Sequence, residues 1–237
     1  MSMINRITHF LARNARKIPI LVKLKRFIAP NYHNIEFSNS NEYWKARYSA
    51  GGNSGEGSYG QLARYKAQFI NEFCDSHKID SVIEFGCGDG NQAGLFNFEN
   101  YTGIDIVPAC IEICKKKFSN RDFIFLTSDE YRKIAVNRSY GLSISLDVIY
   151  HLIEDDVYLK YLDSLFNSSS KYCLVYSSDF GHYDAAVAHV KHRNFTKDVN
   201  ERFADWNLIR NEKNPFEKPH NSLEYGSFAS FYLFERS

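Results

Sequence analysis

A glycine turn between two apolar runs constrains this chain more than any other feature. Residues 82–85 are Val-Ile-Glu-Phe, a run typical of a buried strand. Three glycines follow at alternate positions, Gly86, Gly88 and Gly90, and a second apolar run ends at Asp105. Doubly wound α/β sheets hold adenosine-type cofactors with this arrangement of strand, glycine turn and acidic strand end. The sequence therefore predicts such a site at the carboxyl edge of a sheet.

The spacing of the glycines separates the classes of cofactor. A dinucleotide fingerprint is G-x-G-x-x-G, and its third glycine lets the helix pack closely on the strand. Asn91 stands at that place in this chain, and no G-K-[ST] of a phosphate-binding P-loop follows. The spacing therefore matches neither a dinucleotide fingerprint nor a P-loop, although the glycines still let a ligand approach the backbone closely.

Strand and helix patterns alternate along the chain. We predict strands at 81–86, 101–105, 122–127, 141–147 and 171–178. We predict helices at 61–76, 91–97, 108–118, 129–136, 148–167 and 184–192. This alternation indicates parallel strands with right-handed crossovers. Two later runs, 206–210 and 228–234, are expected to pair antiparallel at one edge, because only a loop separates them.

Charge is distributed unevenly along the chain. The net charge of +1 argues against a dedicated nucleic-acid binder, yet residues 1–35 hold seven Lys or Arg and no Asp or Glu. We expect residues 1–40 to form a basic amphipathic extension, interrupted at Pro19. The extension either packs on the domain or contacts an anionic membrane through residues 1–30. We find neither a membrane-spanning run nor a secretory signal, and expect a cytoplasmic protein, peripheral at the inner face of the membrane if the extension binds lipid.

The cysteines indicate packing rather than metal binding. All five lie in apolar or helical contexts and are expected to be reduced. Because no further Cys/His pair stands at ligand spacing, we expect no metal site. The sequence leaves open whether the chain forms a homo-oligomer.

Taken together, the motifs resemble class I S-adenosylmethionine-dependent methyltransferases over residues 41–237. Glu84 and the three glycines resemble the first motif of that family, and acidic residues follow the next three strands in the same order: Asp105, Ser128-Asp129 and Asp147. Five further segments resemble a bacterial group often associated with surface-glycan biosynthesis: 43–48, 51–55, 145–152, 175–178 and 189–196.

This resemblance implies a Rossmann-like sheet of seven strands, mostly parallel with an antiparallel edge strand, with helices on both faces. It also implies S-adenosylmethionine as the cofactor. Asp105 would accept hydrogen bonds from both ribose hydroxyls, and Asp129 would accept from the adenine amino group or else cap the next helix. Ile106 or Tyr131 would pack on the adenine. The expected cofactor residues are Glu84, Gly86, Cys87, Gly88, Gly90, Asp105, Ile106, Ser128, Asp129 and Asp147.

Catalytic candidates follow the fourth strand. Asp147 and His151 stand four residues apart at the start of a predicted helix, and so would share one face. We expect His151 to act as general base, with Asp147 orienting it or contacting the cofactor, and Tyr150 as the neighbouring candidate. The alternative for His151 is a half-buried packing histidine.

Two segments are candidates for binding the acceptor. Cationic side chains follow the fifth strand, and clustered donors suit an anionic acceptor, unless they form a solvated helix face. The glycine-rich segment, residues 51–60, is expected to close as a lid, or else to serve as a linker. The expected acceptor residues are Trp44, Arg47, Tyr48, His189, His192 and Arg193.

The expected activity is metal-independent O-methylation of a sugar, glycan or phosphorylated small molecule in cell-surface polysaccharide metabolism. Two alternatives stay open. An aminopropyltransferase could use a related cofactor on the same fold, and a non-catalytic module could keep the fold to bind a partner.

Overall fold

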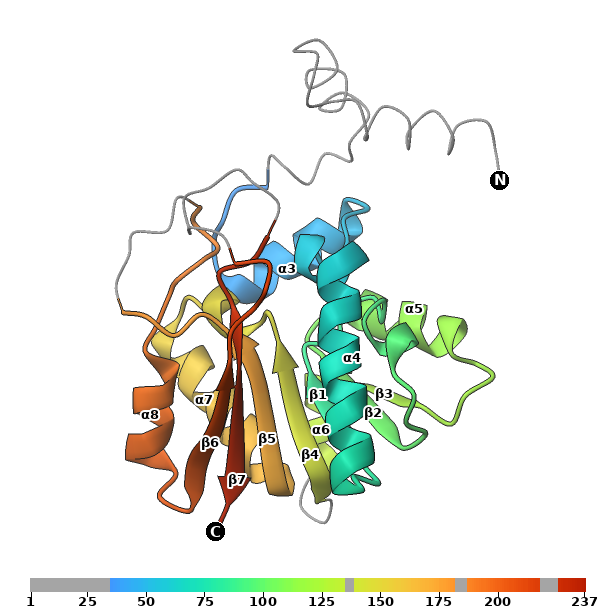
Figure 1. Ribbon diagram of the computed structural model, residues 1–237. Helices are drawn as coiled ribbons and strands as arrows, with labels where there is room; N and C mark the ends of the chain where they lie inside the picture. The colour runs from blue at the N-terminus through green and yellow to red at the C-terminus, as the bar shows by residue number, and fades with distance from the viewer. Residues whose placement is uncertain (1–34, 135–138, 182–186, 218–225) are drawn as a thin grey trace.

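A seven-stranded sheet forms the centre of the computed structural model, which describes residues 35–134, 139–181, 187–217 and 226–237 (Figure 1). The strand order is β3-β2-β1-β4-β5-β7-β6. The strands are β1 Val82–Phe85, β2 Tyr101–Asp105, β3 Ile124–Thr127, β4 Tyr140–Leu146, β5 Ser169–Ser177, β6 Trp206–Glu212 and β7 Ser230–Arg236. Strands β1 to β5 pair in parallel, as predicted.

The two tail strands pair antiparallel, which confirms the prediction for the end of the chain. Strand β7 lies one position in from the edge, because it also pairs antiparallel with β5. Strand β6 therefore runs in the same direction as β5 and forms the outer edge of the sheet.

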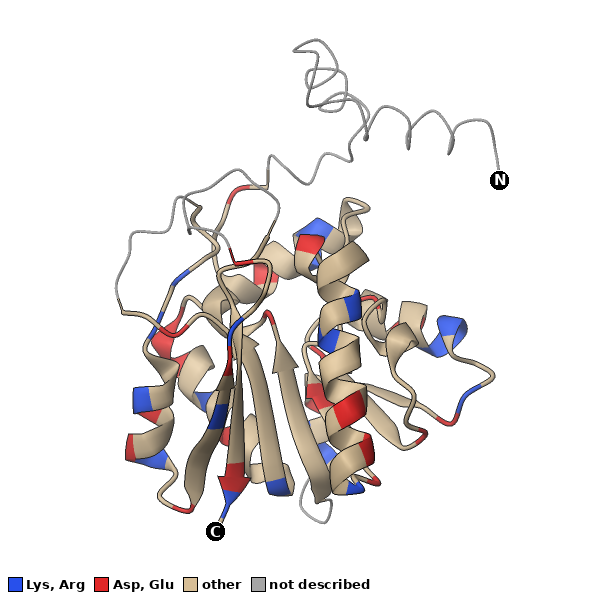
Figure 2. Ribbon diagram, viewed as in Figure 1, with Lys and Arg blue, Asp and Glu red and all other residues tan. Residues whose placement is uncertain are grey.

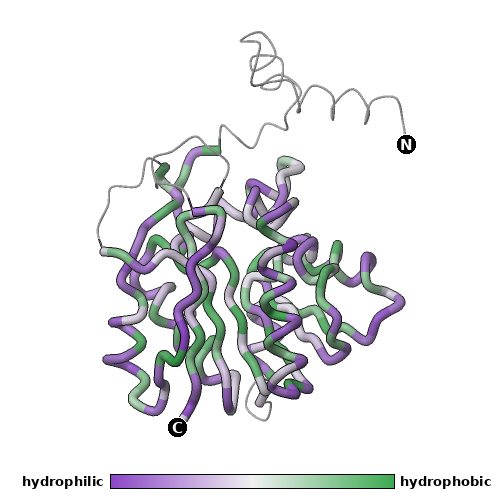
Figure 3. The backbone as a smooth tube through the Cα atoms, in the orientation of Figure 1, coloured by the Kyte–Doolittle hydropathy of each residue, from purple (hydrophilic) through white to green (hydrophobic). Residues whose placement is uncertain are grey.

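Helices cover both faces of the sheet. Helices α4 (Gly60–His77) and α5 (Pro108–Lys117) pack on one face, and α6 (Ser128–Ile134), α7 (Asp155–Asn167) and α8 (Phe195–Arg202) pack on the other. Strands β4 and β5 are mostly buried, as a strand covered on both sides requires, and the tube coloured by hydropathy shows hydrophobic segments within the sheet (Figure 3). The charged side chains lie mostly on the helices and at strand ends (Figure 2).

Helix α3 (Ser40–Ser49) lies beyond the carboxyl ends of the parallel strands, where ligands of such sheets bind (Figure 1). Asn39 caps its start, because the Asn39 side chain accepts a hydrogen bond of 2.9 Å from the backbone N–H of Glu42. The expected helices of residues 1–34 lie outside the described residues.

The predicted helix at 148–167 is wrong in its first third. Asp147 adopts a left-handed backbone with φ +61°, and a single 3-10 turn, Ile149–His151, follows it. Helix α7 begins only at Asp155, where two acidic residues suit the positive end of a helix dipole. Asp147 and His151 are therefore not on one helical face.

Two other predicted helices also differ. Residues 91–97 contain one 3-10 turn, Ala93–Leu95. Of the helix predicted at 184–192, residues 182–186 lie outside the described residues, and 187–192 are not helical. The next helix along the chain is α8, Phe195–Arg202, which the pattern analysis missed.

Candidate functional site

A cavity of about 560 Å³ lies at the carboxyl ends of the first four strands, beside α3. Ten of the predicted site residues line it: Trp44, Tyr48, Gly86, Gly88, Asp105, Ile106, Ser128, Asp129, Asp147 and His151. Eight others are not among its lining residues: Arg47, Glu84, Cys87, Gly90, Tyr150, His189, His192 and Arg193. Sheet topology therefore brings most of the predicted cofactor residues to one place, but only part of the predicted acceptor set.

The glycine turn needs its glycines for two separate reasons. Gly86, Gly88 and Gly90 all have positive φ, at 84°, 55° and 68°, a conformation that residues with a Cβ rarely adopt. Space is also lacking, because a Cβ at Gly88 would lie 2.2 Å from Oγ of Ser54. Gly86 and Gly88 of this turn line the cavity.

Asp105 ties the end of β2 to this turn. Its carboxylate accepts hydrogen bonds from the backbone N–H groups of Gly88 at 2.9 Å and Val107 at 2.8 Å. Burial raises the pKa of this carboxyl to about 6. Two acceptor positions per oxygen leave capacity for a ligand's hydroxyl groups on the cavity side.

Glu84 lies behind the turn and is only 2% exposed. It accepts a hydrogen bond from the hydroxyl of Tyr101, and burial raises its pKa to about 7. Its predicted contact with the cofactor stays a prediction.

Asp129 is not the cap of α6. Thr127 and Glu130 form a capping box there: Glu130 accepts from the backbone N–H of Thr127 at 2.7 Å, and the Thr127 hydroxyl accepts from that of Glu130 at 3.2 Å. Asp129 instead lines the cavity and forms an exposed ion pair with Arg132.

The glycine-rich segment packs directly on the glycine turn. The backbone N–H of Ser54 donates to the carboxylate of Asp89 at 3.2 Å, and the hydroxyl of Tyr59 donates to the same oxygen at 2.6 Å. The Ser54 hydroxyl is 2.8 Å from the hydroxyl of Tyr48, and Nε of Arg47 donates to the carbonyl of Asn53 at 2.8 Å. The segment thus covers the turn, and its opening as a lid stays a prediction.

Asp147 is held by a buried lysine that the sequence analysis did not single out. Nζ of Lys66 lies 2.5 Å from Oδ2 of Asp147, and the Lys66 side chain is fully buried. The hydroxyl of Tyr150 donates to Oδ1 of Asp147 at 2.7 Å. Lys66 lies on the apolar face of α4 with Leu62 and Ile70. A lysine within such an apolar stripe is the sequence signal that could have indicated a buried ion pair.

His151 is oriented by a backbone carbonyl. Its Nδ1 lies 2.8 Å from the carbonyl oxygen of His189. A carbonyl can only accept, so the proton of the neutral ring is on Nδ1 and Nε2 keeps its lone pair. The rings of Trp44 and His189 pack around the imidazole, and burial lowers its pKa to about 4. The carbonyl of His189 thus holds the position expected for Asp147.

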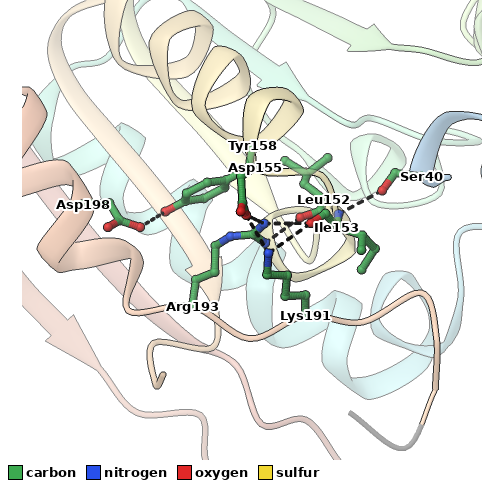
Figure 4. A network of polar contacts seen from close by, with 8 residues as sticks. All are labelled: Ser40, Leu152, Ile153, Asp155, Tyr158, Lys191, Arg193 and Asp198. Atoms are coloured by element: carbon green, nitrogen blue, oxygen red, sulfur yellow. Dashed lines mark hydrogen bonds and ion pairs between the residues drawn. The ribbon is translucent and has the colours of Figure 1, made fainter. Parts of the chain in front are cut away.

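Two cations of the predicted cluster, Lys191 and Arg193, contact protein groups (Figure 4), and neither lines the cavity. Arg193 and Lys191 both donate to Oδ1 of Asp155, each at 2.6 Å. His192 is 3% exposed and lies 2.8 Å from the hydroxyl of Ser178. The interpretation of this cluster as an open anion site is therefore not supported.

The described residues offer little for other kinds of site. Within the described ranges no helix has the length and apolar character to cross a bilayer. No three or more His, Cys, Asp or Glu of the described residues are grouped so that they could hold a metal ion. All five cysteines are buried and free.

Comparison with known proteins supports one reading of this site. Residues 83–167 match a family model described as a methyltransferase domain, and no curated protein matches the chain. The fold is similar to that of the N-methyltransferase NodS from Bradyrhizobium japonicum WM9, solved with S-adenosyl-L-homocysteine (TM-score 0.62, 11% identity, covering 84% of this chain and 99% of that one).

Two other solved structures share the fold. One is the methyltransferase domain of bacterial CtHen1 (TM-score 0.57, 18% identity, 74% of this chain and 100% of that one). The other is magnesium protoporphyrin IX methyltransferase from Synechocystis PCC 6803 with bound SAM (TM-score 0.54, 14% identity, 86% and 100%). The chain thus has the fold of these methyltransferases, and residues 83–167 match a methyltransferase domain.

Proposed function

We propose that this protein transfers a methyl group from S-adenosylmethionine to a hydroxyl of a small-molecule acceptor, a sugar, glycan or sugar phosphate. The observation that carries the proposal is the shared cavity: two glycines of the turn, Gly86 and Gly88, and Asp105 line it together with His151. When bound, the cofactor supplies an electrophilic methyl group. The residues of the chain must then position the acceptor and remove its proton.

The residues at the cavity fit this cofactor. Asp105 has unused acceptor positions for the ribose hydroxyls, and Ile106 and Tyr131 offer apolar surface beside it for the adenine. Ser128 and Asp129 place polar groups next to that surface. The glycine turn lets a ligand approach the backbone.

His151 is the proposed base. Because burial holds the pKa of His151 near 4, the ring is neutral at physiological pH and Nε2 can accept a proton. Trp44, which packs edge-on against His151 with 5.1 Å between ring centroids, lines the same cavity and would pack on the apolar face of a sugar ring. Asp147, already bound to Lys66 and Tyr150, would contact the cofactor rather than the base.

The resemblance to a bacterial surface-glycan group supports a place in cell-surface polysaccharide metabolism. The alternative reaction, aminopropyl transfer, needs free acidic groups to bind a polyamine, and Asp129 is already paired with Arg132.

We also propose that residues 1–30 dock on anionic lipid. Deletion of these residues should then abolish cosedimentation with anionic liposomes at low salt.

Calorimetry with S-adenosylmethionine tests the cofactor first. Asp105→Asn should weaken binding about 10- to 100-fold, since charge-assisted hydrogen bonds are lost, whereas Asp163→Asn, in an exposed ion pair of α7, should not. Absence of binding to the unaltered protein would refute the enzyme and support a non-catalytic module.

The acceptor is found by uptake of labelled methyl. Nucleotide sugars, lipid-linked glycans and sugar phosphates form the panel, with polyamines and amines as the competing classes. With the acceptor that responds, His151→Ala should reduce turnover at least about tenfold while cofactor affinity is kept. Unchanged turnover would remove His151 from the mechanism.

A further inference from the structure

The segment 189–193, which looked like an anion site in the sequence, holds the turn that carries His151. Each residue of 150–153 has a hydrogen-bond partner on this segment, and the carbonyl of Ile153 has two, Nη2 of Arg193 and, at 3.3 Å, Nζ of Lys191. The carbonyl of Tyr150 accepts from the backbone N–H of Lys191 at 2.8 Å, and Nδ1 of His151 donates to the carbonyl of His189 at 2.8 Å.

Arg193 completes this set from outside the cavity (Figure 4). Its Nη1 donates to the carbonyl of Leu152 at 2.5 Å, and its Nη2 donates to that of Ile153 at 3.0 Å. The Arg193 side chain is only 8% exposed, and its guanidinium lies over the ring of Tyr158 at 4.3 Å. A buried guanidinium needs such partners, and here they are backbone oxygens of the turn.

We propose that Arg193 is a positioning residue, which fixes the His151 turn against the carbonyl of His189 and so keeps Nε2 as the proton-accepting atom. This inference rests on the proposed function of His151 as base. The rigid fork of arginine can bind two carbonyls and a carboxylate at once, whereas lysine offers one compact ammonium group.

The surroundings of His151 give the inference a measurable signature. The ionisable groups that face its ring are Arg47 of α3, Asp147 at the end of β4 and His189, with Tyr150 next to it in the turn. Burial is the main cause of its low pKa. If the turn loosens, water reaches the ring, and the pKa must rise toward the ordinary histidine value near 6.5.

The test is ¹⁵N NMR of the histidine-labelled full-length protein, which needs no acceptor. In the unaltered protein His151 should carry its proton on Nδ1 and titrate near pH 4. Arg193→Met should raise the midpoint by about one pH unit or more and move part of the proton to Nε2. Arg193→Lys should give a smaller change in the same direction. Arg202→Met, which removes the half-exposed arginine of the pair with Asp163, should change neither.

The inference would be overturned if His151 in Arg193→Met had the same titration midpoint and the same protonated nitrogen as in the unaltered protein. A purely structural role of Arg193 would alter folding but not the position of that proton. Should that variant not fold, Arg193→Lys decides, and wild-type behaviour there is equally fatal. Failure of the proposed function has a different result: His151→Ala would keep full turnover, while the shifts in the Arg193 variants would still be seen.

Discussion

The buried ion pair of Lys66 and Asp147 makes the free energy of unfolding sensitive to loss of the Lys66 ammonium group. The Lys66 side chain is fully buried and that of Asp147 is 11% exposed. At an effective dielectric of about 20, unit charges 2.5 Å apart attract by roughly 7 kcal/mol. Desolvation of the two ions offsets much of this, so the pair itself adds little. Removing one partner is different, because it leaves an uncompensated charge and costs about 3–5 kcal/mol.

Lys66→Met keeps the length of the apolar stem and removes the charge. It should lower the free energy of unfolding by about 3–5 kcal/mol, which is a large part of the total for a domain of this size. Denaturant unfolding measures the change, provided that the slope against denaturant stays constant. The double variant with Asp147→Asn should be more stable than Lys66→Met alone, since the buried negative charge is then gone as well.

The matched control is Lys160→Met. Lys160 pairs with Asp156 at 3.2 Å, but both side chains are more than two thirds exposed, so this change should cost at most about 0.5 kcal/mol. Equal losses for Lys66→Met and Lys160→Met would refute the reasoning. A double variant that is no more stable than Lys66→Met would refute it too.

Three further outcomes are expected. Glu84 holds its proton up to a pKa of about 7 in the folded chain, above its unfolded value, so its contribution to stability should be lost as pH rises from about 4.5 to 7; Glu84→Gln should remove this contribution from a thermal-unfolding profile, and a profile parallel to that of the parent would contradict the assignment. Gly88→Ala places a Cβ against Ser54 at a positive φ, so it should cost about 1–3 kcal/mol, which denaturant unfolding would show. Asp89→Ala removes the acceptor shared by Ser54 and Tyr59, so hydrogen exchange in the glycine-rich segment should speed up about tenfold or more; exchange as slow as in the parent would contradict it.

The fold could be predicted where local pattern and sheet topology agree. The strand before Gly86 and the strand ending at Asp105 are short, buried and parallel, and their carboxyl ends must meet at one edge. Antiparallel pairing of the tail followed from the connection between its two strands, which the sequence analysis interpreted as a loop without a crossover. These inferences need only periodicity and chain length.

The features that the sequence did not predict depend on contacts between distant segments of the chain. Periodicity alone did not show that Asp147 has a left-handed backbone conformation and that α7 begins only at Asp155. The two acidic residues at the start of α7 were a usable signal for that helix start. The roles of Lys66 and Arg193 depend on partners 81 and about 40 residues away. A composition-based argument assigns such cations to solvent or to a ligand, because it cannot know which carbonyls lie opposite.

Helix α3 and the His151 turn share an anchor. The hydroxyl of Ser40, the first residue of α3, accepts from the backbone N–H of Ile153 at 2.9 Å, and the backbone N–H of Ser40 donates to Glu154 at 3.0 Å. The same helix carries Trp44, Arg47 and Tyr48 and so holds the cover over the glycine turn. Any displacement of α3 that admitted a substrate would therefore also displace the turn that carries the imidazole of His151. Access to the cavity and the position of the proposed base are therefore coupled through this one helix.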